Sequence, residues 1–138
     1  MASQWRPEQW TQFEDALRRD LLAAGNDKDA WRRLTRAALR IMAQYSTSFY
    51  IVSRFLPPHK RERVEVIYAS VRYPDEVVDT LDIPNEERLR RLDVWSENYE
   101  KALEIGNTRQ AVAAGVTPIL AAFAQAISTA ARLLWDIF

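Results

Sequence analysis

Residues 58–79 read PHKRERVEVIYASVRYPDEVVD, and the fold class is best argued from this stretch. Pro57 and Pro58 end any helix before them, and Pro58 suits the first position of a new helix. Apolar side chains then recur at spacings of three and four, at Val64, Ile67, Tyr68 and Val71. This spacing predicts a helix with those four residues as its buried stripe. Within that helix, Pro74 predicts a kink or a new helix start at Asp75.

Helical signals continue on both sides of this stretch. Prolines, glycines and capping residues divide the chain further, at Pro7, Gly25, Asn26, Pro84, Gly106, Gly115 and Pro118. Apolar stripes lie between these breaks, at Trp10, Phe13, Leu17, Leu21 and Leu22, then Trp31, Leu34, Ala38, Ile41, Met42 and Tyr45, and later Leu89, Leu92, Trp95, Tyr99 and Leu103. No alternating strand pattern or internal repeat interrupts them. The sequence predicts an all-α helical bundle, formed as a single domain over residues 1–138.

The last segment allows two interpretations. Residues 111–131 carry no charged side chain, which is about the length of a membrane span. The segment is also rich in alanine and broken by Gly115 and Pro118. Its large apolar residues recur at helical spacing, at Ile119, Leu120, Phe123, Ile127, Leu134 and Phe138. We therefore expect a buried helix rather than a membrane span.

Composition excludes several classes of protein. The 138 residues include no cysteine and one histidine, His59, which excludes a disulfide scaffold and a thiolate metal site. Nine basic and two acidic residues fall in 31–72, whereas four basic and ten acidic residues fall in 73–104. A basic block beside an acidic block, without a recognisable binding module, predicts no binding of nucleic acid. No secretory signal is visible at the N-terminus, so we expect a cytoplasmic protein.

Three charged residues near the end of the quoted stretch suggest a binding site. Asp75 and Asp79 are four residues apart, so on a helix their carboxylates share one face. Hard oxygen ligands of this kind suit Mg²⁺ or Mn²⁺ rather than zinc. Arg72 lies one turn earlier on the same side, where its guanidinium can bind phosphate oxygens. The three residues together are a plausible holder for a magnesium–diphosphate complex, although acidic pairs also occur on many solvated helices.

The wider order of residues resembles a known family. Ser46-Thr47-Ser48-Phe49-Tyr50 is followed by Leu56-Pro57-Pro58, Arg61, Tyr68, Arg72, Asp75 and Asp79. This order and spacing are similar to the squalene/phytoene synthase family, the head-to-head prenyl synthases, which have Ser-x-Ser-Phe, Leu-x-Pro, an arginine and then Tyr-x-x-x-Arg-x-x-Asp-x-x-x-Asp. Residues 31–104 carry the best resemblance. It implies the N-terminal half of the isoprenoid synthase fold.

The resemblance also implies a role for each matching residue. Asp75 and Asp79 correspond to the aspartates that hold Mg²⁺ against a prenyl diphosphate, and Arg72 to the arginine that contacts this diphosphate. The remaining matches are to residues lining the substrate site, at Ser46, Ser48, Phe49 and Tyr68. From the residues alone, the two serines are equally consistent with helix capping, and Phe49 and Tyr68 with core packing. Glu76 is expected to lie outside the direct ligands.

The activity implied by the resemblance is a magnesium-dependent, head-to-head condensation of two prenyl diphosphates. Farnesyl and geranylgeranyl diphosphate are both suitable substrates, and a role in carotenoid or hopanoid synthesis would follow. The resemblance leaves open whether NADPH takes part. Peripheral contact with a membrane is compatible with such apolar substrates.

The chain departs from the family after Asp79. Family members are longer and carry a second acidic motif, and no further Asp-x-x-x-Asp follows here. The missing wall would come from a C-terminal half or from a second copy of the chain. One alternative is a non-catalytic helical interaction module that keeps the half-fold and oligomerises through its apolar C-terminal helix. Another is an unrelated metal-binding helical protein.

Overall fold

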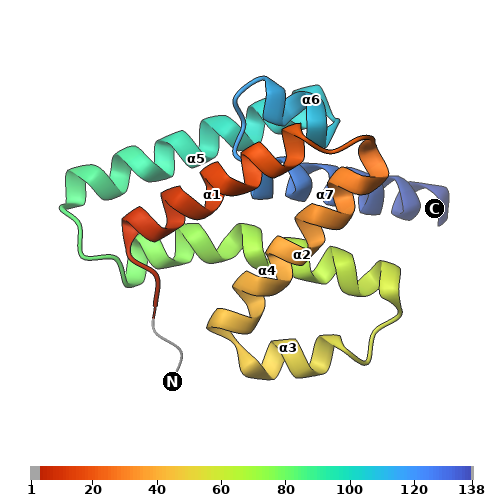
Figure 1. The fold of residues 1–138 in the computed structure, drawn as a ribbon, viewed down its shortest axis with the longest axis horizontal. Helices are drawn as coiled ribbons and strands as arrows, with labels where there is room; N and C mark the ends of the chain where they lie inside the picture. The colour runs from red at the N-terminus through yellow and green to blue at the C-terminus, as the bar shows by residue number, and fades with distance from the viewer. Residues whose placement is uncertain (1–3, 138) are drawn as a thin grey trace.

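The computed structural model describes residues 4–137, with side chains described for residues 4–127 (Figure 1). The described chain forms seven helices and no strand: α1 (Pro7–Leu22), α2 (Asp27–Tyr45), α3 (Thr47–Ser53), α4 (Pro58–Asp79), α5 (Asn85–Ile105), α6 (Thr108–Ala113) and α7 (Pro118–Ile137). The predicted all-α bundle is confirmed.

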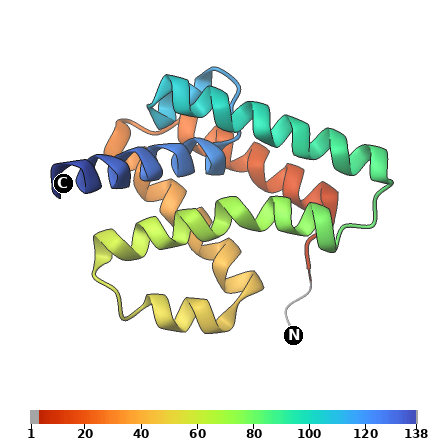
Figure 2. The same ribbon diagram turned by 180° about the vertical axis from the view of Figure 1, so that it is seen from behind.

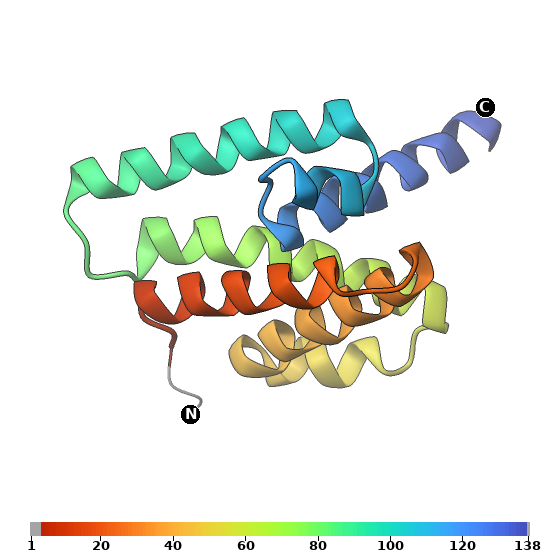
Figure 3. The same ribbon diagram turned by 45° about the horizontal axis from the view of Figure 1, so that its top comes forward.

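The helices pack around α4 and α7. Seen from behind, α7 (blue) passes between α5 (teal) and α4 (green), and it contacts α1, α2 and α6 as well (Figure 2). Seen with its top brought forward, the molecule has α5 along one edge and α2 and α3 along the other, with α1 and α4 between them (Figure 3). The short α3 packs mainly against α2 and α4. It therefore forms an outer flank of the bundle.

The first turns of α7 are part of the core, as the sequence predicts. Its buried residues among those whose side chains are described are Pro118, Ile119, Leu120, Ala121, Ala122, Phe123, Ala124 and Ala126. Ile127 is partly buried, while Leu134 and Phe138 lie outside the residues whose side chains are described. None of the described helices is sufficiently long and apolar to span a membrane.

Aromatic side chains join α1, α2 and α4 at one end of the core. The rings of Trp10 and Tyr45 stack with their centroids 5.7 Å apart, and the edge of Tyr73 meets Trp10 at 5.4 Å. The backbone N–H of Trp5 donates to the Tyr45 hydroxyl at 2.9 Å. These contacts hold Tyr45, the last residue of α2, beside α4.

One arginine joins the start of the chain to its end. Arg18 of α1 donates hydrogen bonds to the backbone carbonyls of Val112 at 2.6 Å and Val116 at 2.9 Å. Both carbonyls lie at the turn from α6 to α7, and that of Val112 also accepts the backbone N–H of Gly115 at 3.1 Å. Arg18 therefore caps the end of α6 from a helix about 95 residues earlier.

Most predicted breaks are confirmed. Pro58, Asn85 and Pro118 each begin a helix, and Gly106 ends α5 in the left-handed conformation with φ 71°. The predicted new start at Asp75 is wrong, because α4 runs through Pro74 to Asp79 as one helix. Proline removes only the backbone bond to Ser70, four residues earlier, and the surrounding packing tolerates this loss.

The predicted buried stripe of α4 is wrong at three of its four residues, while Tyr68 packs partly buried against the core. Val64, Ile67 and Val71 are 38%, 40% and 45% exposed. The residues of α4 that are buried instead are Glu65, Val66, Ala69, Ser70, Glu76 and Val77. Three leucines in other predicted stripes are exposed as well, Leu22, Leu89 and Leu103. Burial of two acidic side chains in place of valine and isoleucine requires partners for their charges.

Candidate functional site

The predicted arginine and aspartates lie along one face of α4. The Nη1 atom of Arg72 is 3.7 Å from Oδ2 of Asp75, an ion pair across one turn. The Asp75 side chain is 54% exposed, and Asp79, one turn further on, is exposed too. The carboxylates predicted as metal ligands are therefore open to solvent on one side of the helix, with the arginine at their N-terminal end.

Arg72 is held in place by two residues that face it from inside the bundle. Its Nη2 atom pairs with Oε1 of Glu76, which is fully buried. Its guanidinium carbon also lies 4.5 Å from the ring centroid of Tyr45, which is a cation–π contact. Because Tyr45 is itself stacked on Trp10, the arginine rests on a rigid support. Its guanidinium is thus oriented before any ligand arrives.

The arginine and its buried acid keep unused hydrogen-bonding capacity. Nε of Arg72 and Oε2 of Glu76 are both buried and make no hydrogen bond within the described residues. A buried group without a partner costs about 1–3 kcal/mol. A ligand or a water that hydrogen-bonds to this pair therefore gains more binding free energy than it would from the same contact on an ordinary surface.

Tyr68 lies one turn before Arg72. Its hydroxyl is buried without a hydrogen-bond partner in the described part of the chain. Burial raises the pKa of this phenol, while the charge of Arg72 opposes the rise. The hydroxyl stays protonated at neutral pH and is available as a hydrogen-bond donor.

The predicted serine segment forms the junction between α2 and α3. Ser46 caps α3, and its Oγ accepts the backbone N–H of Phe49 at 3.2 Å, so the capping interpretation holds for Ser46. Ser48 is exposed. Phe49 is 58% exposed, and its ring lies 5.7 Å from that of Tyr68. The structure thus joins Phe49 to the α4 face, whereas Ser46 is occupied by its capping bond.

The residues present can supply only some of the ligands of a magnesium ion. Among the described residues, no group of three or more His, Cys, Asp or Glu side chains is arranged to hold a metal ion. Mg²⁺ commonly uses one or two carboxylates and completes its octahedron with water and substrate phosphates. Asp75 and Asp79, both open to solvent, can supply those carboxylates. The remaining positions would belong to the substrate and to water.

Two further arginines position this face, and sequence reasoning missed both. Arg88 of α5 donates to the backbone carbonyls of Val77 at 2.9 Å and Leu81 at 2.8 Å, which fixes the end of α4 that carries Asp79. Arg54, after α3, pairs with buried Glu65 of α4. Glu65 shares one helical face with Arg72 and Glu76, but that spacing does not point to Arg54 as its partner.

Exposed apolar side chains surround the site. On α4 they are Val64, Ile67, Val71 and Val78, and in α3 and just after it they are Ile51, Val52 and Phe55, the last 85% exposed. Surface patches of this kind commonly bind apolar ligands or other protein surfaces. The charged face of α4 therefore lies within an apolar surface, which suits a ligand with an anionic head and a hydrocarbon tail.

Comparison with known proteins gives one family. The squalene/phytoene synthase family model matches residues 42–135, which is more than half of the chain and includes the whole of α4. No solved structure matches.

Two relatives match over shorter segments. A presqualene diphosphate synthase of Zymomonas mobilis is 46% identical over 50 residues, and one of Sinorhizobium fredii is 39% identical over 54 residues. These segments are 36% and 39% of this chain but 17% and 19% of the relatives. The matches thus span less than a fifth of each relative's length.

Proposed function

This chain belongs to the squalene/phytoene synthase family, and on that premise we propose that it binds a prenyl diphosphate together with Mg²⁺ in the head-to-head condensation of two prenyl diphosphates. The observation that carries the proposal is the orientation of Arg72 beside Asp75 and Asp79. Neither comparison favours the alternative of a non-catalytic interaction module.

The proposed chemistry is the departure of diphosphate from an allylic carbon. Bound Mg²⁺ supplies positive charge to the leaving diphosphate. Arg72 adds a fixed cation on the same side, and it needs no reorganisation because Glu76 and Tyr45 already orient it. Asp75 and Asp79 orient the metal through their carboxylates.

The surrounding residues would handle the rest of the substrate. The Tyr68 hydroxyl can donate to a diphosphate oxygen, since it has no other partner in the described chain. Phe49 and the exposed valines of α4 offer apolar contacts for the prenyl tail and keep water away from the carbocation. The names of the two relatives support presqualene diphosphate as the product.

Binding of a slowly reacting substrate analogue tests the proposal without requiring turnover. We expect farnesyl thiodiphosphate to bind the chain in titration calorimetry with Mg²⁺ and at least tenfold more weakly with EDTA. Asp75→Asn and Arg72→Gln should each weaken binding about tenfold to hundredfold, because each removes a charge-assisted contact.

A charge-matched control separates the site from general electrostatics. Asp93→Asn removes an exposed carboxylate of α5 and should leave binding unchanged. Two results would show that the α4 face is not the site. One is an affinity that EDTA leaves unchanged, and the other is a loss of affinity in Asp93→Asn as large as that in Asp75→Asn. Mass spectrometry of lipids extracted after incubation with Mg²⁺ and farnesyl or geranylgeranyl diphosphate then reports on turnover.

A further inference from the structure

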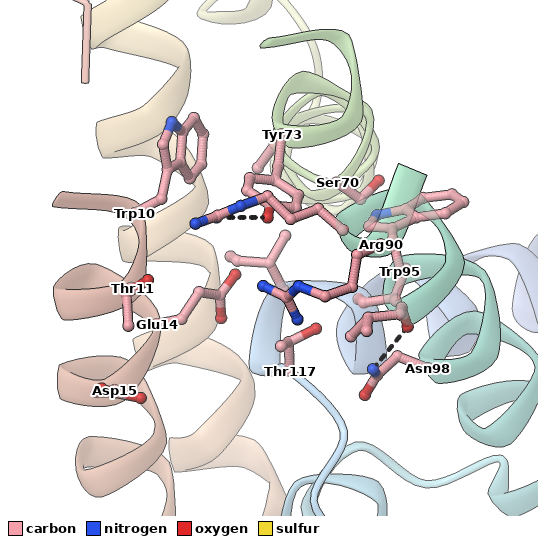
Figure 4. A pocket seen from close by; sticks show the side chains of 15 residues that line it. Trp10, Thr11, Glu14, Asp15, Ser70, Tyr73, Arg90, Trp95, Asn98 and Thr117 are labelled. Atoms are coloured by element: carbon pink, nitrogen blue, oxygen red, sulfur yellow. Dashed lines mark hydrogen bonds between the residues drawn. The ribbon is translucent and has the colours of Figure 1, made fainter. Parts of the chain in front are cut away.

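A cavity lies on a different face of α4 from the arginine and aspartates. It occupies about 260 Å³ between α1, α4, α5 and the start of α7 (Figure 4). Its aromatic walls come from Trp10, Tyr73 and Trp95. The volume equals that of about nine waters in the liquid, which is room for a small organic molecule. Neither Asp75 nor Asp79 lines it.

One oxygen of an acidic side chain in this cavity lacks a hydrogen-bond partner among the described residues. Glu14 points from α1 into the space between α1 and α5, toward Thr117 at the start of α7 (Figure 4). The backbone N–H of Ile119 favours its ionised form, but Oε2 is buried and makes no hydrogen bond within the described residues. Arg18, one turn later, is occupied by the carbonyls after α6. The unpaired oxygen is therefore open to a ligand.

The charges around the cavity restrict what that ligand can be. Glu14 and exposed Asp15 on the α1 wall repel an anion. On the opposite wall, Arg90 and Arg91 repel a cation, although both are also paired with Glu87. An uncharged molecule avoids both penalties. Its polar group must reach Glu14 while its apolar part contacts the aromatic and aliphatic walls.

A hydroxyl is the group that best meets this requirement. Burial raises the pKa of Glu14 to about 7, so both protonation states are present at neutral pH. A hydroxyl can donate to the carboxylate and can accept from the carboxylic acid. An ammonium can donate to the carboxylate but has no lone pair with which to accept from the acid.

We propose that this cavity is a binding site for a small aromatic or branched alcohol, with its hydroxyl on Glu14 and its hydrocarbon against Trp95 and Tyr73. The site is separate from the proposed prenyl diphosphate site and does not depend on it. Because the cavity joins four helices, its ligand would also stabilise the folded bundle.

Three probes of similar shape test the proposal on the full chain. 2-Phenylethanol, propylbenzene and 2-phenylethylamine differ at one end by a hydroxyl, a methyl and an ammonium group. In amide NMR titrations we expect 2-phenylethanol to shift signals of residues lining the cavity and to bind about tenfold more tightly than propylbenzene, the value of one hydrogen bond. The amine should bind more weakly than the alcohol.

Variants of Glu14 identify the recognition group. Glu14→Leu should abolish the preference for the alcohol over propylbenzene, while Glu14→Gln, which keeps a hydrogen-bonding group, should retain it. Glu8→Gln, on an exposed position of α1, is the matched control. Equal affinity for the alcohol and propylbenzene, tighter binding of the amine, or no shifts at the cavity would each overturn the proposal. The comparison of probes on the unmodified chain decides even where Glu14→Leu fails to fold.

Discussion

Replacing Glu14 by glutamine should stabilise the protein at alkaline pH and have little effect at acidic pH. The pKa of Glu14 is raised from 4.5 to about 7 because burial disfavours the charged carboxylate. Between these two values the folded state binds more protons than the unfolded state, so the free energy of unfolding falls as pH rises. The pKa difference of about 2.5, at about 1.36 kcal/mol per unit, gives a loss of about 3.4 kcal/mol. Glutamine removes this cost because it carries no charge.

Urea denaturation followed by circular dichroism at pH 4.5, 6 and 8 measures this effect. The difference in unfolding free energy between Glu14→Gln and the unmodified protein should grow by about 3 kcal/mol from the lowest pH to the highest. Other carboxylates titrate over the same range, but their contributions to the unfolding free energy are the same in both proteins and cancel in this difference. Glu8→Gln, on an exposed position of the same helix, should show no such growth. A difference for Glu14→Gln that stays constant within 0.5 kcal/mol, on the order of the error of such fits, would refute the increase in the pKa of Glu14 by burial of its carboxylate.

Two further substitutions test other parts of the structure. Glu76→Gln removes the buried counter-ion of Arg72, leaves it only exposed Asp75, and should lower the unfolding free energy by about 3 kcal/mol in urea titrations; a loss below about 1 kcal/mol would mean that the pair is not buried. Gly106→Ala should cost about 1 kcal/mol in the same assay, since φ is 71° and no atom lies within 4 Å of the added Cβ; no loss would contradict the left-handed cap.

The helix boundaries could be predicted because their causes are local. Pro58, Pro118 and Gly106 act through their own backbone geometry, which is independent of what packs around them. Pro74 shows the limit of this argument. The loss of one backbone bond did not decide whether α4 continues, because contacts of the whole helix outweigh it.

The buried face of α4 could not be predicted from apolar spacing. That spacing favoured Val64, Ile67 and Val71, whereas Glu65 and Glu76 are buried in their place. An acid is buried only where a partner meets it, and the partner of Glu65 lies on a different segment. The arginine and the two aspartates were brought onto one face as predicted, since spacing on a single helix is sufficient for that. Tyr45 and Arg88 were missed because they reach the site through packing between helices.

The contact of Arg18 with the α6–α7 turn has a consequence for how the protein is made. During synthesis α1 leaves the ribosome before the turn from α6 to α7, because the carbonyl of Val112 follows Arg18 by 94 residues. At ordinary rates of translation this separation takes about 5–20 s. During that interval the apolar side chains of α1 have no completed core to enter, and Arg18 has none of its carbonyl acceptors. The apolar face of α1 is therefore open to chaperones and proteases until the turn from α6 to α7 has emerged, and Arg18 can bind its carbonyl acceptors only after that point.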